Sequence, residues 1–282
     1  MTPEARGRRR VRTPVIAGAA VAWLVLAVTE WAAAAGPPAS ASVHGAHSHG
    51  VGEASVPFGG AAGVADLAAQ GAGMPPQPGG SAWAAGWLVM LVAMMGPTLI
   101  PVIRHVAQRS LPRQRVTLVI SLIAGYALAW LLAGVGLTAI NAGIRAALDP
   151  VGDPAPVLAG IVICLAWQAS PVKQHSLNRH MLIPPLPARG RRSYLGALQM
   201  GGRHGLWCVG SCWALMLLAL LSPSGHLVVM PAVAAWIWAE RFERPATPRW
   251  RIHVPTTALR ILIAALRGLR LSAPTAAPAR WP

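Results

Sequence analysis

Long apolar runs dominate the chain. Stretches with no charged residue cover residues 13–29, 83–103, 116–141 and 154–172. A helix needs about 20 apolar residues to cross the hydrocarbon core of a bilayer, and each run reaches or approaches that length. The pattern therefore predicts an all-α, polytopic helical membrane protein.

Turn and helix-breaking residues divide these runs. A further stretch, residues 204–239, has 36 residues without Lys, Arg, Asp or Glu. One helix of that length would measure about 54 Å, against a hydrocarbon core of about 30 Å. The turn signal Ser-Pro-Ser-Gly at 222–225 lies in its middle, so we expect a helical hairpin with a short second leg, the sixth span. Pro97 and Pro101 are expected to kink or end the second span.

The remaining composition defines four regions. Residues 1–35 carry an Arg-rich start and a first apolar run, which fits an N-terminal transmembrane anchor and also a signal peptide; we favour the anchor because its apolar run approaches a full span. Residues 36–82 hold 11 Gly and 6 Pro and are expected to form a disordered extracytoplasmic loop. Residues 83–244 are predicted to form a five-helix membrane domain. In the basic tail, residues 245–282, leucines and Ile263 recur at helical spacing among arginines. This pattern predicts an amphipathic helix on the inner membrane surface, which we favour, or a cytosolic tail helix without lipid contact.

The distribution of charge sets the expected topology. The net charge is +16, which in a soluble protein would suggest nucleic-acid binding as a function. No basic stripe here is interleaved with aromatic residues, so we do not favour that function. Residues 1–14, 104–115 and 173–203 and the tail after Glu240 hold 5, 4, 6 and 8 basic residues, which leaves only Arg145 for the other segments. Because Lys and Arg collect on the cytoplasmic side, this alternation predicts both termini inside, in the plasma (inner) membrane of a bacterium.

One face of the fifth predicted span carries candidate metal ligands. His204, Cys208 and Cys212 are spaced four residues apart and fall within about 80° of arc on a helix. Two thiolates and an imidazole form a soft ligand set that suits a copper or zinc ion. The competing interpretation is that both cysteines are small buried packing residues, and spacing alone favours it.

Other histidines and methionines extend this hypothesis. His175 and His180 lie in the preceding inner loop and could complete a Cys2His2-like set with the two thiols, although solvated loop histidines would have the same sequence. Clustered histidines in the outer loop could capture metal. Methionine thioethers in the second span could bind Cu(I), although methionines in apolar helices are mostly packing residues. These residues are His44, His47, His49, Met90, Met94 and Met95.

No catalytic constellation is present in the sequence. It contains no nucleophile elbow, no phosphate-binding glycine loop and no His-Glu-x-x-His motif. The acidic residues nearest the spans, Glu30, Asp149, Asp153 and Glu240, all fall at span boundaries. An enzyme is therefore the least favoured class.

Several stretches together resemble one bacterial family. The segments are Leu-Val-Ala-Met-Met-Gly-Pro at 91–97 with Pro101, Ser-Pro-Val-Lys at 170–173, Gly201–Met216 and Ala-Glu-Arg at 239–241. They are similar, in the same order, to signatures of predicted metal-binding integral membrane proteins, a domain of unknown function sometimes labelled copper chaperone. The resemblance covers residues 83–244 and implies that fold together with metal binding.

The chain departs from this family at its thiols. Two positions where the family usually has Cys read Ser176 and His180, and another reads Ser211, so only Cys208 and Cys212 carry over as ligands. The leading hypothesis is thus a metal-handling membrane protein, with copper as the first candidate. The lost thiols motivate the alternative, a scaffold that binds another membrane protein and no metal.

Overall fold

The computed structural model describes residues 3–35, 80–152, 154–182, 191–222, 226–258, 260–261 and 263–264. Within these residues the regular structure is helical, without strands, which confirms the all-α prediction. Residues 36–79 of the predicted loop, the outer histidines and most of the tail helix lie outside the described residues, and residues 80–82, predicted as the end of that loop, are the start of a helix. The elements are α1 (Pro3–Ala35), α3 (Gly80–Arg109), α4 (Arg115–Leu148), η1 (Asp149–Val151), α5 (Pro154–Ala169), α6 (Pro171–His180), α7 (Arg191–Leu221) and α8 (His226–Glu240).

Four helices are long and apolar enough to cross a membrane: Val11–Thr29 within α1, all of α3 and α4, and Ser193–Leu221 within α7. The pair α5 and α6 would make a fifth span, bent by 67°. The predicted count of six requires that bent pair and the shorter apolar helix Val228–Glu240 both to cross.

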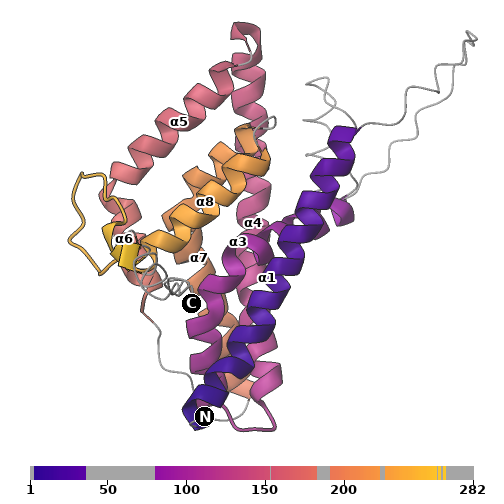
Figure 1. Cartoon of the computed structure of the whole chain (residues 1–282), viewed down its shortest axis with the longest axis vertical. Helices are drawn as coiled ribbons and strands as arrows, with labels where there is room; N and C mark the ends of the chain where they lie inside the picture. The colour runs from indigo at the N-terminus through magenta and orange to yellow at the C-terminus, as the bar shows by residue number, and fades with distance from the viewer. Residues whose placement is uncertain are drawn as a thin grey trace, which may run out of the picture.

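The bundle is organised around the contact between α4 and α7, the most extensive between any two helices (Figure 1). Glycines allow this close approach, because a Cβ on Gly125 or Gly201 would overlap a backbone carbonyl of the opposite helix. Helix α1 packs on α3 at the outside of the bundle. The start of α1 and the α3–α4 connection lie at one end, and the turn after α4 lies at the other.

Helix α3 is longer than expected. It continues through Pro97 and Pro101 to Arg109, so of the two predicted effects of these prolines, a kink or an end of the helix, the end is wrong. A proline inside a helix disturbs the backbone hydrogen bonds of the preceding turn. Neighbouring donors supply bonds there: Trp238 Nε1 donates to the Met94 carbonyl at 2.6 Å, and Thr98 Oγ1 donates to the Met95 carbonyl at 2.7 Å.

Tryptophans and one arginine tie the helices together. The indole of Trp87 donates to the carbonyl of Trp130 at 3.0 Å, and that of Trp167 donates to Gly210 at 3.1 Å. Arg145 Nη2 donates to the carbonyl of Leu221 at 3.1 Å, at the C-terminal end of α7. Terminal carbonyls of a helix have no partner within it, so this bond satisfies an acceptor that would otherwise be free.

The break between α5 and α6 follows from Ser170 and Pro171. Pro171 has no N–H and disfavours helical geometry at the residue before it, and Ser170 is extended with φ −73° and ψ 143°. The Ser170 hydroxyl then accepts from the Lys173 N–H at 3.1 Å and caps the new helix. The segment predicted as one span, residues 154–172, is therefore the start of a bent pair. Of the predicted inner loop, residues 173–203, the parts 173–180 and 191–203 are helix.

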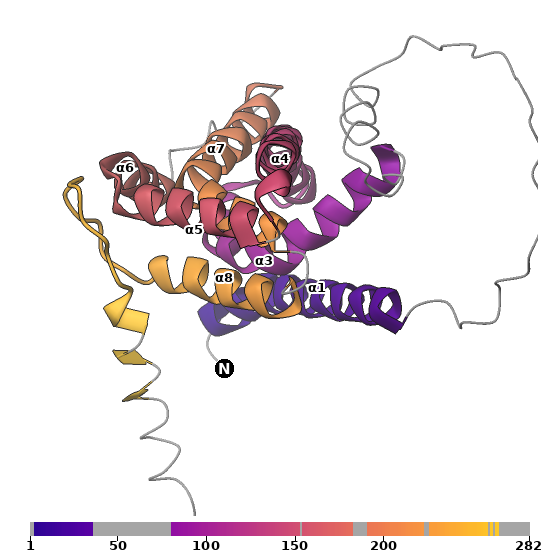
Figure 2. The same cartoon turned by 90° about the horizontal axis from the view of Figure 1, so that it is seen from above.

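After α8 the chain returns along α6. We call residues 241–258 the tail strap; Figure 2 shows it running out beside α6. Arg251 donates its N–H to the Ala169 carbonyl at 2.9 Å, and the Asn178 side chain pairs with both backbone groups of Ala246 at 2.7 and 3.3 Å. These bonds attach the strap to the bend between α5 and α6.

Candidate metal site

The two cysteines of α7 are fully buried in the bundle. Cys208 has no exposed surface and Cys212 is 1% exposed. The Cys212 thiol donates to the Cys208 carbonyl at 3.0 Å, one turn earlier on the same helix. Cys164 lies on α5, and none of the three cysteines forms a disulfide. All three therefore remain as thiols.

The bend after α5 brings His180 to α7. The rings of His180 and His204 lie with centroids 3.9 Å apart, and the side chains are 5% and 7% exposed. Both rings interact electrostatically with the Cys208 sulfur. Their Nε2 atoms are buried and have no hydrogen-bond partner. Buried polar atoms are normally satisfied, so two orphaned imidazole nitrogens beside a thiol indicate a place for a ligand.

Two further side chains from other helices reach Cys208. Tyr126 on α4 donates its hydroxyl to the Cys208 sulfur at 3.2 Å, and Met95 Sδ on α3 lies 3.9 Å from the same sulfur. Two sulfur ligands each about 2.3 Å from one metal lie about 4 Å apart when the angle between the bonds is about 120°. The Cys208–Met95 spacing is therefore compatible with a shared metal ion.

A cation also borders the thiol. Arg241, at the start of the tail strap, donates Nη2 to the Ser211 hydroxyl at 2.9 Å and reaches the Cys208 sulfur at 3.5 Å. Its Nε and Nη1 atoms are buried without a hydrogen-bond partner. The thiol side of the site thus carries one positive charge from the protein itself, which favours a singly charged metal over a doubly charged one.

The remaining sequence candidates lie elsewhere. His175 is exposed on α6, and its ring packs edge-on against Trp207 with centroids 5.8 Å apart, away from the thiols. Met90 and Met94 are buried in the hydrophobic core, while His44, His47 and His49 lie outside the described residues. Among the residues that the structure places, no three or more His, Cys, Asp or Glu side chains are arranged to hold a metal ion together.

A small hollow reaches His204. Its volume is about 280 Å³, and His204 forms part of its wall. The other lining residues come from α3, α6 and α7 and from Leu182, just after α6: Val102, Arg179, Leu182, Met200, Arg203 and Trp207. The site therefore has an opening beside His204, with two arginines at it.

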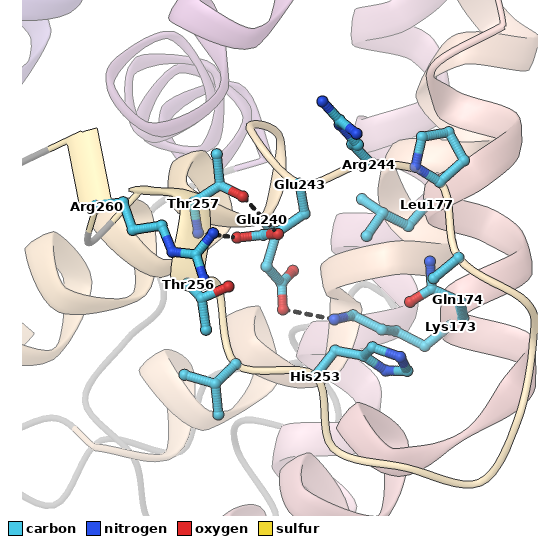
Figure 3. Close-up of a pocket in the computed structure, with 13 residues that line it drawn as sticks. Lys173, Gln174, Leu177, Glu240, Glu243, Arg244, His253, Thr256, Thr257 and Arg260 are labelled. Atoms are coloured by element: carbon cyan, nitrogen blue, oxygen red, sulfur yellow. Dashed lines mark hydrogen bonds and ion pairs between the residues drawn. The ribbon is translucent and has the colours of Figure 1, made fainter.

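A larger cavity of about 600 Å³ lies between α6, the end of α8 and the tail strap (Figure 3). Lys173 Nζ and Glu240 Oε1 form an ion pair at its wall, 2.5 Å apart, with both side chains buried. The same oxygen accepts from Trp236 at 2.7 Å. Glu243 accepts from the backbone N–H and hydroxyl of Thr257 at 2.6 and 2.9 Å. Both carboxylates are therefore used to hold the strap and α8 in place.

Three side chains at Cys208 were missed as site residues by reasoning from spacing alone. Met95 was interpreted mainly as a packing residue, Arg241 was noted only within a stretch of family resemblance, and Tyr126 was not singled out. All three reach the thiol from helices or segments far away in the sequence, so no local spacing could connect them. The motif resemblance was the signal that could have found them.

One comparison with known proteins gives a match, to a family. No curated protein and no solved structure shows significant similarity to the chain. The family model described as PpoB2, copper chaperone, matches residues 84–266, which is more than half of the chain and includes α3 to α8 and the tail strap. The chain therefore belongs to the PpoB2 copper chaperone family.

Proposed function

We propose that the protein is a multi-pass protein of a bacterial plasma membrane that binds Cu(I) at Cys208 and passes it on. Both termini lie in the cytoplasm, as the distribution of basic residues indicates. The observation that carries the proposal is the pair of buried, unpartnered Nε2 atoms of His180 and His204 beside the Cys208 thiol. Membership of a copper chaperone family supports the same metal.

The donor chemistry favours copper over zinc. Thiolate and thioether sulfur are soft ligands that select Cu(I), and neutral imidazole suits it too. Structural zinc sites are closed, four-coordinate sets of Cys, His and carboxylate ligands, and the described residues bring no such set together. With Met95 included, the site offers Cu(I) sulfur and nitrogen donors from α3, α6 and α7.

The role is binding and transfer rather than catalysis. A general acid or base must lie within reach of a substrate in a position to exchange protons. The two carboxylates near the site, Glu240 and Glu243, are engaged with Lys173, Trp236 and Thr257 instead. In this proposal the protein holds the metal ion without changing its oxidation state.

Metal analysis of the full-length protein tests the proposal. We expect the detergent-purified protein, loaded with Cu(I) under anaerobic conditions, to retain close to one equivalent after desalting. Cys208→Ser should abolish retention, and Cys164→Ser is the matched control because Cys164 lies on α5 with none of these donors beside it. Retention of copper by Cys208→Ser equal to that of the control would refute this site.

A second function remains open because of the replaced thiols. Ser176 and Ser211 stand where the resembled family has Cys, which weakens the ligand set. In that case the protein would be a scaffold for another membrane protein. Stoichiometric co-purification of a membrane partner, unchanged by Cys208→Ser and without bound copper, would support the scaffold against the chaperone.

A further inference from the structure

The hollow beside His204 is strongly cationic at its opening. Arg179 on α6 and Arg203 on α7 both line it, and both side chains are exposed. Neither forms a salt bridge with a described residue, and the ion pair of Lys173 with Glu240 lies at the other, larger cavity. The opening thus carries two positive charges with no counter-charge paired to them among the described residues.

The surrounding sequence adds no compensation. Residues 173–203 contain six basic residues and no Asp or Glu. Glu240 and Glu243 line the separate 600 Å³ cavity and are not among the lining residues of this hollow. Summed charges of one sign around a cleft focus the electrostatic potential at its mouth, and they attract oppositely charged molecules while repelling like ones.

A positively charged opening opposes the arrival of a free metal cation. We propose that copper reaches His204 through this hollow as an anionic complex, in which Cu(I) is held by two thiolates of a small thiol carrier. The inference rests on the proposed function and names the form in which the substrate arrives. The volume of about 280 Å³ suits part of a small molecule rather than a folded domain.

The transfer is a ligand exchange without oxidation or reduction. The Cys208 sulfur forms a bond to copper as the bonds from copper to the two carrier sulfurs break. One carrier thiolate takes the proton from the Cys208 thiol, and the other leaves as the thiolate. The complex arrives with one negative charge, and the departing thiolate carries that charge away, so charge is conserved and copper stays Cu(I).

The geometry assigns an order to the side chains along this path. Arg179 and Arg203 meet the complex at the surface. His204 lines the hollow and also stacks on His180, and its unpartnered Nε2 is the first buried donor that copper meets. Cys208 follows one turn further along α7. Copper can therefore pass from carrier to thiol over His204 Nε2, which has no hydrogen-bond partner among the described residues.

Loading kinetics of the full-length protein in detergent test the inference. Copper is supplied either as Cu(I) with excess glutathione, an anionic thiolate complex, or as the cationic tetrakis(acetonitrile)copper(I) complex. Protein-bound copper is measured after rapid desalting at timed intervals. Arg179→Gln with Arg203→Gln should slow loading from the glutathione complex by about tenfold, within the range of electrostatic steering, with unchanged final stoichiometry.

Matched variants separate charge from folding. Arg179→Lys with Arg203→Lys keeps the charge and should load at close to the wild-type rate. Arg249→Gln removes one exposed arginine that does not line the hollow and should change little. Added potassium nitrate should slow wild-type loading from glutathione, because screening weakens attraction between opposite charges. Loading from the cationic complex should not be slowed by salt or by the glutamine substitutions.

The outcomes distinguish this inference from the proposed function. If the wild-type protein binds copper from both complexes at rates insensitive to salt and to the glutamine substitutions, the binding function stands and the anionic carrier is refuted. If the wild-type protein takes copper from neither complex, both fail. Slower loading from glutathione alone, restored by lysine, is the result that supports the inference.

Discussion

The glycines between α4 and α7 allow a quantitative test of the packing that holds the site. A Cβ added to Gly201 would lie 2.8 Å from the Leu122 carbonyl carbon and 3.1 Å from its Cα, and it would overlap the carbonyl oxygen. Carbon atoms pack at about 3.5–4.0 Å, so α4 and α7 would have to separate by about 1 Å where they cross. The obstacle is backbone, which cannot move aside as a side chain does.

We expect Gly201→Ala to destabilise the protein by about 1–3 kcal/mol, the usual cost of overpacking. A change of this size lowers the melting temperature by roughly 3–10 °C in a domain of this size. Tryptophan fluorescence during heating of the detergent-purified protein measures it. The separation should also draw Tyr126 on α4 away from Cys208 on α7, so weaker copper retention should accompany the lower melting temperature.

Gly136→Ala is the matched control for this prediction. No atom lies within 4 Å of a Cβ built on Gly136, which is on the partner helix α4. Alanine is a better helix former than glycine by about 1 kcal/mol, so this variant should be neutral or more stable. If Gly201→Ala melts no lower than Gly136→Ala, the helices do not cross as closely as described and the reasoning is refuted.

Three other substitutions test single contacts. Glu240→Gln should cost about 3–5 kcal/mol in thermal unfolding, because it leaves the buried Lys173 ammonium without its partner. Arg145→Met should cost about 1 kcal/mol, because it removes the hydrogen bond to the Leu221 carbonyl at the end of α7. Trp238→Phe should cost on the order of 1 kcal/mol or more, because the hydrogen bond to α3 is lost along with part of the ring. Melting temperatures measure the losses for Arg145→Met and Trp238→Phe.

Each of these has its own control. Replacing Glu240 and Lys173 together by Leu and Met should recover much of the loss, since no unpaired charge remains; equal instability of the single and double variants would argue against the ion pair. Arg145→Lys keeps a donor and should fall between wild type and Arg145→Met. Trp213→Phe removes an indole that makes no hydrogen bond within the described structure, so a loss equal to that of Trp238→Phe would contradict the assigned bond.

Sequence reasoning located the apolar helices well and their ends less well. Length and absence of charge identify α3, α4 and α7, since lipid as solvent demands long apolar runs. The observed helices start and end at other residues than predicted. Polar residues of good helix propensity can extend a helix beyond the apolar run from which its ends were predicted. Thus α7 begins at Arg191 rather than near His204, and α3 passes through two prolines. Thr98 and Trp238 donate hydrogen bonds to carbonyls of α3 beside Pro97. The bond from Trp238 comes from α8, so no pattern within α3 predicts it.

The sequence by itself determined the helical class, the segregation of basic residues, and the placing of His204, Cys208 and Cys212 on one face, because each depends on periodicity or composition within one segment. Only the tertiary structure decided which other residues meet Cys208. The bend at Ser170 turns α6 so that His180 reaches His204 while His175 faces Trp207. Contacts between distant segments depend on how helices cross, and crossing depends on packing that no single segment contains.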